Sequence, residues 1–287
     1  MTIDRLHTLH ERQFEGSQFV YPVLSRRSGG ISIGINLNPD KVCNFDCVYC
    51  QVNRVSQSET RFVATEQLLV ELDRALHAVT SQQLFETDKF RATPSHLRKL
   101  TDIAFSGDGE PTTQRNFDEI VAACADVRDA HQLPDLPLVL ITNASMFHRP
   151  HVQRALETFD RRCGEIWAKL DAGSPDYYAR INRAPFSFEH ILNNIREAVR
   201  LRPLVIQSLF MRIEGQAPPH SEWQAYCQRL LELAEVGQLK LIQIYTIARA
   251  PAEAYVTPLS DAEVDDLVAF VREQTGLPVS GYYGVQL

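Results

Sequence analysis

Long hydrophobic runs and an excess of positive charge are both absent from the sequence. The longest apolar stretches, such as residues 136–141, fall far short of the roughly 18 residues that span a bilayer. Residues 1–10 are polar and mixed in charge, unlike a secretory signal. With 29 Lys and Arg against 36 Asp and Glu, the net charge of −7 creates no global field that attracts a polyanion. We therefore expect a soluble, cytoplasmic protein with no membrane partner, in which RNA binding would need a local basic patch.

Internal repeats, low-complexity segments and linkers rich in Gly, Pro or Ser are also absent. The 287 residues are 44% apolar and 23% charged, which excludes collagen-like, disordered and disulfide-scaffold proteins. This much apolar material is enough for one large core or two modest ones. We predict an N-terminal extension over residues 1–30, followed by one α/β domain over residues 31–287.

Strand and helix patterns alternate along the chain. Large apolar residues alternate with small or polar ones over Ile31–Leu37, as in a strand with two distinct faces. Residues 65–79 carry leucines at helical spacing, with Thr65 as a candidate N-cap. Further strands are expected at 102–105, 138–142, 165–170, 205–211, 240–246 and near Val279, and further helices at 117–130, 151–158, 188–201, 222–236 and 261–274.

Strands separated by helices predict a parallel sheet with right-handed crossovers. About six or seven strands are fewer than the eight of a complete (β/α)8 barrel, so periodicity alone leaves open whether the sheet curls into a partial barrel or stays open. Polar residues at the carboxyl ends of the strands favour a site at a barrel mouth. The connection over residues 82–100 is long enough to be a lid, a substrate wall or a surface excursion.

Three of the six cysteines lie within eight residues, between the first strand and the first helix. Cys43, Cys47 and Cys50 follow the spacing Cys-x3-Cys-x2-Cys. In a reducing compartment, clustered thiols favour zinc or an iron–sulfur cluster. The segment offers no fourth ligand for structural zinc, whereas a cubane held by three thiolates keeps one iron open for chemistry. Three free core thiols, or zinc completed by a distant His, are the alternatives.

A second motif follows the next predicted strand, where Ser106–Thr112 reads SGDGEPT. Glycines at such a position let the backbone approach a ligand closely, and a helix start offers free N–H groups. A dinucleotide-binding fingerprint would need Gly at position 112, where Thr stands. The alternative is an ordinary turn with a solvated Glu110.

The cysteine spacing, with Tyr49 directly before the last cysteine, resembles the cluster loop of the radical S-adenosylmethionine (SAM) superfamily. The resemblance implies a partial (β/α)6 barrel of the TIM type. It also implies a [4Fe–4S] cluster, with Cys43, Cys47 and Cys50 as iron ligands and SAM on the open iron. Tyr49 would lie near the adenine, and Glu110 would receive the methionine ammonium. The full set of implied SAM contacts is Tyr49, Gly107, Asp108, Gly109, Glu110, Thr142, Asn143, Lys169 and Asp171.

Further segments resemble one branch of this superfamily, which is related to the wyosine tRNA-base synthases and has many bacterial members without an assigned substrate. They are Pro22–Gly34, Ile141–Asn143, Lys169–Gly173, Ile181–Arg183 and Gln243–Arg249. The motif at residues 107–110 departs modestly from the family's Gly-Gly-Glu-Pro pattern. Wyosine synthases hold a second cluster with cysteines upstream of the triad, and none precedes Cys43 here. That absence and the acidic charge count against wyosine-type tRNA chemistry.

The leading prediction is an enzyme that reductively cleaves SAM to a 5′-deoxyadenosyl radical and abstracts hydrogen from a small-molecule or nucleotide substrate. A one-electron donor such as flavodoxin or ferredoxin would be its partner. Alternatives are a tRNA-base modifying enzyme, an activase that installs a glycyl radical, and a non-enzymatic zinc-holding module. The candidate substrate contacts are Gln207, Gln243, Tyr245 and Arg249, each of which could instead satisfy a neighbouring polar group. Cys124, Cys163 and Cys227 are expected to be buried free thiols.

Overall fold

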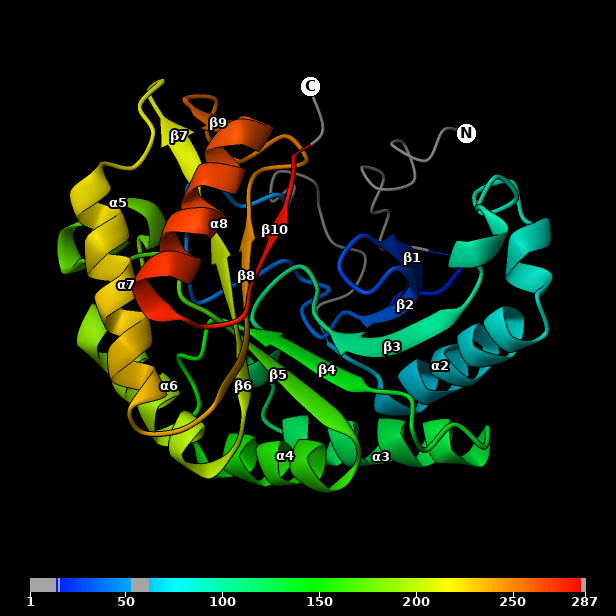
Figure 1. The fold of residues 1–287 in the computed structure, drawn as a ribbon. Coiled ribbons are helices and arrows are strands. Elements are labelled where there is room, and N and C mark those ends of the chain that lie inside the picture. Colours follow the sequence, from blue (N-terminus) through cyan, green and yellow to red (C-terminus); the bar gives the residue numbers. More distant parts are fainter. Residues whose placement is uncertain (1–13, 15, 53–61, 285–287) are drawn as a thin grey trace. The chain divides into compact units, whose positions relative to one another are not determined.

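The computed structural model describes residues 14, 16–52 and 62–284, and its strands and helices alternate along the chain (Figure 1). These residues divide into two compact units. The first contains the described residues within Met1–Cys43, Arg54–Ile141 and Arg149–Glu165. The second contains those within Asn44–Asn53, Thr142–His148 and Ile166–Leu287. The predicted boundary at residue 30 stays a prediction, and residues 1–13 and 15 of that extension lie outside the described residues.

The first unit holds a run of four neighbouring strands: β1 (Val20–Ser25), β2 (Gly30–Ile35), β3 (Leu100–Phe105) and β4 (Leu138–Thr142). β2, β3 and β4 are parallel, as predicted, and β1 pairs antiparallel with β2. The sequence pattern did not reveal β1. Five of its six residues are buried, so the alternation that marks a half-buried strand is missing there.

Three helices accompany these strands: α2 (Thr65–Thr80), α3 (Phe117–Ala130) and α4 (Pro150–Arg161). The predicted apolar stripe of α2 is buried and includes Leu68, Leu72 and Leu76. Glu71 lies on the same face and is also buried, because its carboxylate accepts the backbone N–H groups of residues 18, 19 and 20 at 2.8–3.1 Å. A buried charge that accepts several N–H groups is stabilised, so this contact ties the start of β1 to α2.

The long connection over residues 82–100 contains two short 3-10 turns, Gln83–Glu86 and Ser95–Leu97. Its apolar side chains Leu84, Phe85 and Phe90 are buried. The connection is therefore packed against the core of the first unit. The use of this connection as a lid or a substrate wall stays a prediction.

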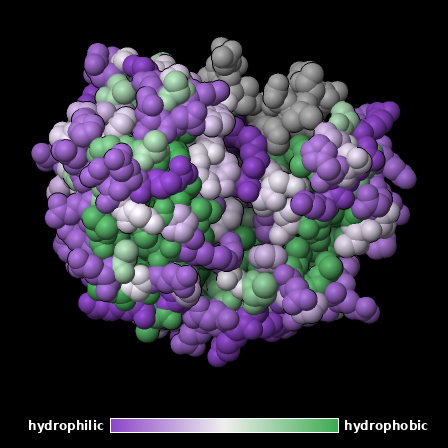
Figure 2. Space-filling model, viewed as in Figure 1, coloured by the Kyte–Doolittle hydropathy of each residue, from purple (hydrophilic) through white to green (hydrophobic). Residues whose placement is uncertain are grey.

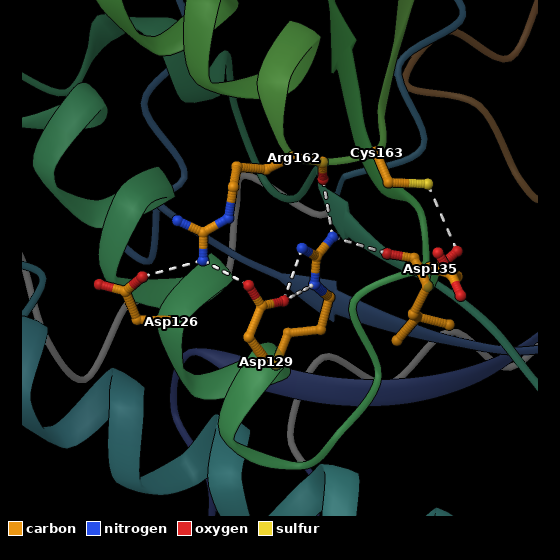
Figure 3. Close-up of polar contacts among 7 residues, drawn as sticks. Asp126, Asp129, Asp135, Arg162 and Cys163 are labelled. Carbon is orange, nitrogen blue, oxygen red and sulfur yellow. Dashed lines mark hydrogen bonds and ion pairs between the residues drawn. The ribbon is translucent and has the colours of Figure 1, made fainter.

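A charged network joins the carboxyl ends of α3 and α4 (Figure 3). Arg128 is only 1% exposed, and one of its terminal nitrogens donates to the carbonyl oxygens of Leu136 and Arg162 at 2.9 and 2.7 Å. Its Nε donates to Asp129 at 2.7 Å. Arg162 in turn donates to Asp126 and Asp129 at 2.9 and 2.6 Å. The buried guanidinium of Arg128 therefore has a carboxylate partner on α3 and two backbone carbonyl partners beyond it.

The three cysteines outside the triad are free, but only Cys124 and Cys227 are buried. The prediction that Cys163 is buried is wrong. This residue lies in the turn between α4 and β5 with φ of +51°, and its sulfur faces the carbonyl oxygen of Asp135 at 3.4 Å (Figure 3). Turn residues lie at the surface, so the apolar character of the thiol did not determine its position.

The second unit holds another run of strands: β5 (Gly164–Lys169), β6 (Leu204–Leu209), β8 (Leu239–Tyr245) and β10 (Val279–Tyr282). Their pairs are parallel, as predicted. The accompanying helices are α5 (Pro175–Asn182), α6 (Phe188–Leu201), α7 (His220–Ala234) and α8 (Asp261–Thr275). A separate antiparallel pair, β7 (Met211–Ile213) and β9 (Val256–Pro258), was not predicted, and neither was α5.

The register of these strands aligns the polar residues that the sequence singled out. Lys169 on β5 pairs with Gln207 on β6, and Gln207 pairs with Gln243 on β8. Tyr245 follows two positions later on β8, opposite Leu209. Paired positions in a parallel sheet present their side chains on the same face, so these side chains share one face near the carboxyl ends of the strands.

Hydrophilic side chains cover most of the face shown in Figure 2, with smaller hydrophobic areas between them. None of the helices in the described part of the chain combines the length and the apolar character that a membrane span requires. Among the described residues, the three α-helices of the first unit and the four of the second each bury one apolar side.

Candidate functional site

The cysteine loop follows β2, and its three cysteines are half-buried and form no disulfide. Cys43 belongs to the first unit, whereas Cys47 and Cys50 belong to the second. The backbone N–H of Cys50 donates to the carbonyl of Cys47 at 3.0 Å, which closes a tight turn. Among the described residues, no group of three or more His, Cys, Asp or Glu side chains is arranged to hold a metal ion. The ligand set therefore stays a prediction.

In the second unit, the end of α5 holds the cysteine loop through backbone hydrogen bonds. Val48 donates its N–H to the carbonyl of Ile181 at 2.9 Å, and Asp46 donates to the carbonyl of Asn182 at 3.3 Å. A helix end has carbonyl groups without intrahelical partners, and here the loop supplies the donors. The path of the loop around Cys47 is thus fixed by α5.

The Asn182 side chain reaches the same loop. It is buried, and its amide nitrogen lies 3.6 Å from the sulfur of Cys47 and 3.2 Å from the hydroxyl of Tyr49. Burial raises the pKa of Cys47 to about 11, despite the opposing effect of Lys169. The free thiol is therefore protonated at neutral pH, and a bound metal would displace its proton.

Tyr49 is the centre of a buried polar cluster with Lys169 and Asp171. Its hydroxyl hydrogen-bonds to the Asp171 carboxylate and accepts from the Lys169 ammonium at 3.0 Å. Lys169 also lies 3.5 Å from Asp171 and hydrogen-bonds to Tyr245. Burial, and then the charge of Asp171, raise the pKa of Tyr49 well above its usual value. Burial alone would lower the pKa of Lys169, but Asp171, Tyr245 and Cys47 together outweigh it and the pKa is raised, so the ammonium stays charged.

The turn after β4 is tied to the cysteine loop by side-chain amides. Asn143 donates to the side-chain oxygen of Asn44 at 2.9 Å, and Asn44 donates to the Ser145 hydroxyl at 2.8 Å. The Thr142 hydroxyl accepts the N–H of Ala144 at 3.1 Å. Asn143 therefore contacts the loop between Cys43 and Cys47, while Thr142 stabilises the turn itself.

In the first unit, the Ser106–Thr112 motif packs against the segment that leads to Cys43. A Cβ at Gly107 would lie 2.3 Å from the Asn36 side-chain oxygen, and one at Gly109 would lie 2.3 Å from the Val42 carbonyl. Asn36 also donates to the Asp108 carboxylate at 2.8 Å and accepts the Asp108 N–H at 3.1 Å. Only glycine fits at these two positions, because the backbones approach so closely.

Glu110 is buried in this motif, at 3% exposure, so a turn with a solvated glutamate does not describe it. Its Oε1 accepts both the N–H and the hydroxyl of Thr112, which caps the 3-10 turn Pro111–Thr113. Both bonds go to one carboxylate oxygen and hold the carboxylate in a single orientation.

The candidate substrate contacts have partners of their own. Gln207 donates to the side-chain oxygen of Gln243 at 3.0 Å, and both are buried. Arg249 donates from Nε to Gln51 at 2.8 Å, directly after Cys50. Arg249 thus lies beside the cysteine loop, strand register puts Gln207 next to Lys169, and Tyr245 bonds to Lys169. The roles of the four residues toward a substrate stay predictions.

Sequence reasoning missed the parts played by Asn182, Asn36 and Gln51. Asn182 lies in a segment that was noted only for its family likeness, and it is 135 residues from Cys47 along the chain. No spacing rule relates residues so far apart. Asn36 lies near the end of the predicted strand Ile31–Leu37 and directly after the observed β2, and its polarity there was the one available signal.

Comparisons with known proteins bear on this site. A family model described as Radical SAM superfamily matches residues 37–216. The protein named UPF0026 protein MJ1312, from Methanocaldococcus jannaschii, is 30% identical over 162 residues, which cover 56% of this chain and 43% of that protein. The chain thus spans less than half the length of this curated relative.

Two solved structures share the fold. A radical SAM methyltransferase from Sphaerobacter thermophilus has a TM-score of 0.64 at 13% identity, covering 95% of this chain and 71% of that one. A structure of TYW1 with a lysine-pyruvate adduct bound has a TM-score of 0.55 at 18% identity, covering 95% and 82%. These likenesses confirm the predicted α/β fold class, a partial TIM-like barrel.

Proposed function

This chain belongs to the radical SAM superfamily, and on that premise we propose that it cleaves SAM reductively at a [4Fe–4S] cluster held by Cys43, Cys47 and Cys50. Three cysteines within eight residues of one loop, inside the matched region and outside any disulfide, carry the proposal. Soft thiolate donors suit an iron–sulfur cluster. The next cysteine in the sequence is Cys124, so the loop supplies one ligand fewer than a cubane has irons.

When bound, the cluster would pass one electron to the SAM sulfonium, so that the bond to C5′ breaks into methionine and a 5′-deoxyadenosyl radical that takes hydrogen from a substrate carbon. The electron would come from a one-electron donor such as flavodoxin or ferredoxin. The substrate, a small molecule or a nucleotide, must be held close to this radical with water excluded.

In the first unit, the residues of the Ser106–Thr112 motif would receive the methionine part of SAM. A buried carboxylate at Glu110, held in one orientation by Thr112, is suited to a charge-assisted bond with an ammonium group. Gly107 and Gly109 keep the loop against Asn36 and Val42, and Asp108 fastens it there through Asn36.

In the second unit, polar side chains around Tyr49 would receive the rest of SAM. The charged ammonium of Lys169 can pair with the SAM carboxylate, and Asp171 and Asn143 can hydrogen-bond to ribose hydroxyls, with Thr142 shaping the turn. Tyr49 would lie beside the adenine. The proposed substrate contacts are Gln207, Gln243, Tyr245 and Arg249, of which Arg249 is suited to a carboxylate or phosphate.

The test is anaerobic reconstitution with iron and sulfide, followed by dithionite and SAM. We expect about four irons and four sulfides per chain and the release of 5′-deoxyadenosine, measured by mass spectrometry. Cys47→Ala should lose the cluster and the product together. Cys163→Ala is the matched control, because it removes an exposed thiol outside the triad and should behave as wild type.

Two results would contradict the proposal. Stoichiometric zinc without iron or sulfide in the wild type would favour a zinc-holding module. A complete cluster with undiminished SAM cleavage in Cys47→Ala would refute the ligand assignment.

A further inference from the structure

Asn182, the last residue of α5, stands out because it contacts the cysteine loop with both its backbone and its side chain. It is 3% exposed. Its amide nitrogen lies 3.6 Å from the sulfur of Cys47 and 3.2 Å from the hydroxyl oxygen of Tyr49. A side-chain amide carries two hydrogens, so it can donate one to each of these acceptors.

The neighbours of Tyr49 determine which end of the Asn182 amide faces the sulfur. The Asp171 carboxylate only accepts, so the Tyr49 hydroxyl donates its single proton to it. The Lys169 ammonium only donates, so Tyr49 accepts from it. Having given its proton to Asp171, Tyr49 can only accept from Asn182. The amide therefore presents its NH2 group, and not its carbonyl, toward Tyr49 and Cys47.

The position of Asn182 is also held by hydrogen bonds to the backbone of α5. Its carbonyl accepts the N–H of Asp46, and the preceding carbonyl of Ile181 accepts the N–H of Val48. The start of α5 is held by Glu222, whose carboxylate accepts the hydroxyl of Ser174 at 2.6 Å. Hydrogen bonds at both ends of α5 therefore hold the donor next to the sulfur.

We propose that Asn182 is a positioning residue that raises the reduction potential of the cluster by donating an N–H···S hydrogen bond to the Cys47 thiolate. The inference rests on the proposed function. One electron entering the cluster increases the negative charge on its sulfur ligands, so a donor at the sulfur stabilises the reduced form more than the oxidised form. Such partners of metal ligands tune the metal without touching it.

The experiment measures the midpoint potential of the reconstituted protein without SAM, by redox titration followed by electron paramagnetic resonance. Asn182→Leu keeps the branching at Cγ and removes the donor, and Asn182→Asp keeps the shape but, when ionised, can only accept. Each should make reduction about threefold less favourable or more, a shift of about 28 mV downward at 59 mV per tenfold for one electron. The negative charge of the aspartate should make its shift the larger one.

Asn194→Leu is the matched control. Asn194 is a buried asparagine of α6, and its amide donates to the backbone carbonyls of Ala144 and Ser145 rather than to sulfur. Its loss should leave the potential at the wild-type value. Only assembled clusters give the resonance signal, so incomplete loading of a variant does not alter the reading.

Unchanged potentials in both Asn182 variants, with a cluster present, would overturn this inference and leave the proposed function standing. A wild-type protein that assembles no [4Fe–4S] cluster would overturn the proposed function and this inference together. A potential lowered equally by Asn194→Leu would show a general effect of buried-amide loss, which also overturns the role of the N–H···S bond.

Discussion

At the scale of single residues, Glu110 is a carboxylate buried within the Ser106–Thr112 motif. Its Oε1 accepts the N–H and the hydroxyl of Thr112, and these two donors stabilise its orientation. A bound ammonium would form a charge-assisted hydrogen bond with this oriented carboxylate, so we expect SAM affinity to depend on Glu110.

We expect Glu110→Gln to weaken SAM binding by about 10- to 100-fold, because a hydrogen bond to a charged group is replaced by a neutral one. The dissociation constant can be measured by equilibrium dialysis with the cluster-loaded protein. Iron content should not change. Glu119→Gln removes the same charge from an exposed position on α3 and should leave the affinity unaltered. Equal SAM affinity in Glu110→Gln and wild type would refute this role.

At the scale of secondary-structure elements, the network of Figure 3 makes the packing of α3 against the end of α4 depend on pH. Burial alone would raise the pKa of Asp129, but hydrogen bonds from Arg128 and Arg162 outweigh it and the pKa is lowered. A carboxyl group whose pKa falls on folding stabilises the fold above its unfolded pKa, about 3.9. That stabilisation is lost as the pH falls through the folded pKa.

We expect Asp129→Asn to lower the free energy of unfolding at pH 7 by about 0.5–1 kcal/mol, a small value because the side chain is 33% exposed. The difference from wild type should shrink below about pH 3.9 as the wild-type carboxyl becomes protonated. Urea unfolding at pH 7 and at pH 3 measures both values. Asp126→Asn should lower the free energy of unfolding at pH 7 by less than Asp129→Asn does, because Asp126 is 72% exposed and bonds to Arg162 alone in this network. If the difference in unfolding free energy between wild type and Asp129→Asn stayed constant or grew at pH 3, the stabilising role of the Asp129 carboxylate would be contradicted.

Local signals explain which elements the sequence could predict. α8 begins at a capping box formed by Ser260 and Glu263 and is followed by Gly276, with φ of +68°. Local sequence signals therefore mark both of its ends. β1 lacks alternation because it is almost wholly buried, and α5 is only eight residues long. Short or fully buried elements carry no period that distinguishes them.

The candidate site likewise contains residues that the local sequence could indicate and contacts that only the tertiary fold creates. The spacing of Cys43, Cys47 and Cys50 is local and could be read directly, as could the glycines at 107 and 109. The contact of Asn182 with Cys47 depends on how α5 meets the loop, which is a property of the tertiary fold. The pairing of Gln207 with Gln243 depends on the register of β6 and β8, so the sequence could indicate two polar positions but not that they bond to each other.

At the scale of the whole molecule, the net charge of −7 bears on the class of substrate. Binding of a tRNA requires Lys and Arg to neutralise several phosphates, and the affinity then falls steeply as salt increases. A chain with seven more acidic than basic residues repels a polyanion at long range. A small molecule or a nucleotide has too few charges for this repulsion to matter, which favours a small substrate over a structured RNA.

We therefore expect the low-molecular-weight fraction of a cell extract, and not its RNA fraction, to increase 5′-deoxyadenosine formation by the reduced, cluster-loaded protein. Because few phosphates would be neutralised, that increase should change little between low and physiological salt, and ribonuclease treatment of the extract should not remove it. Cys47→Ala should respond to neither fraction, which separates enzyme-dependent product from background. Stimulation by the RNA fraction that is abolished by ribonuclease and falls steeply with salt would instead identify a tRNA-base modifying enzyme, whose basic patch would then have to be local and strong enough to overcome the charge of the rest of the chain.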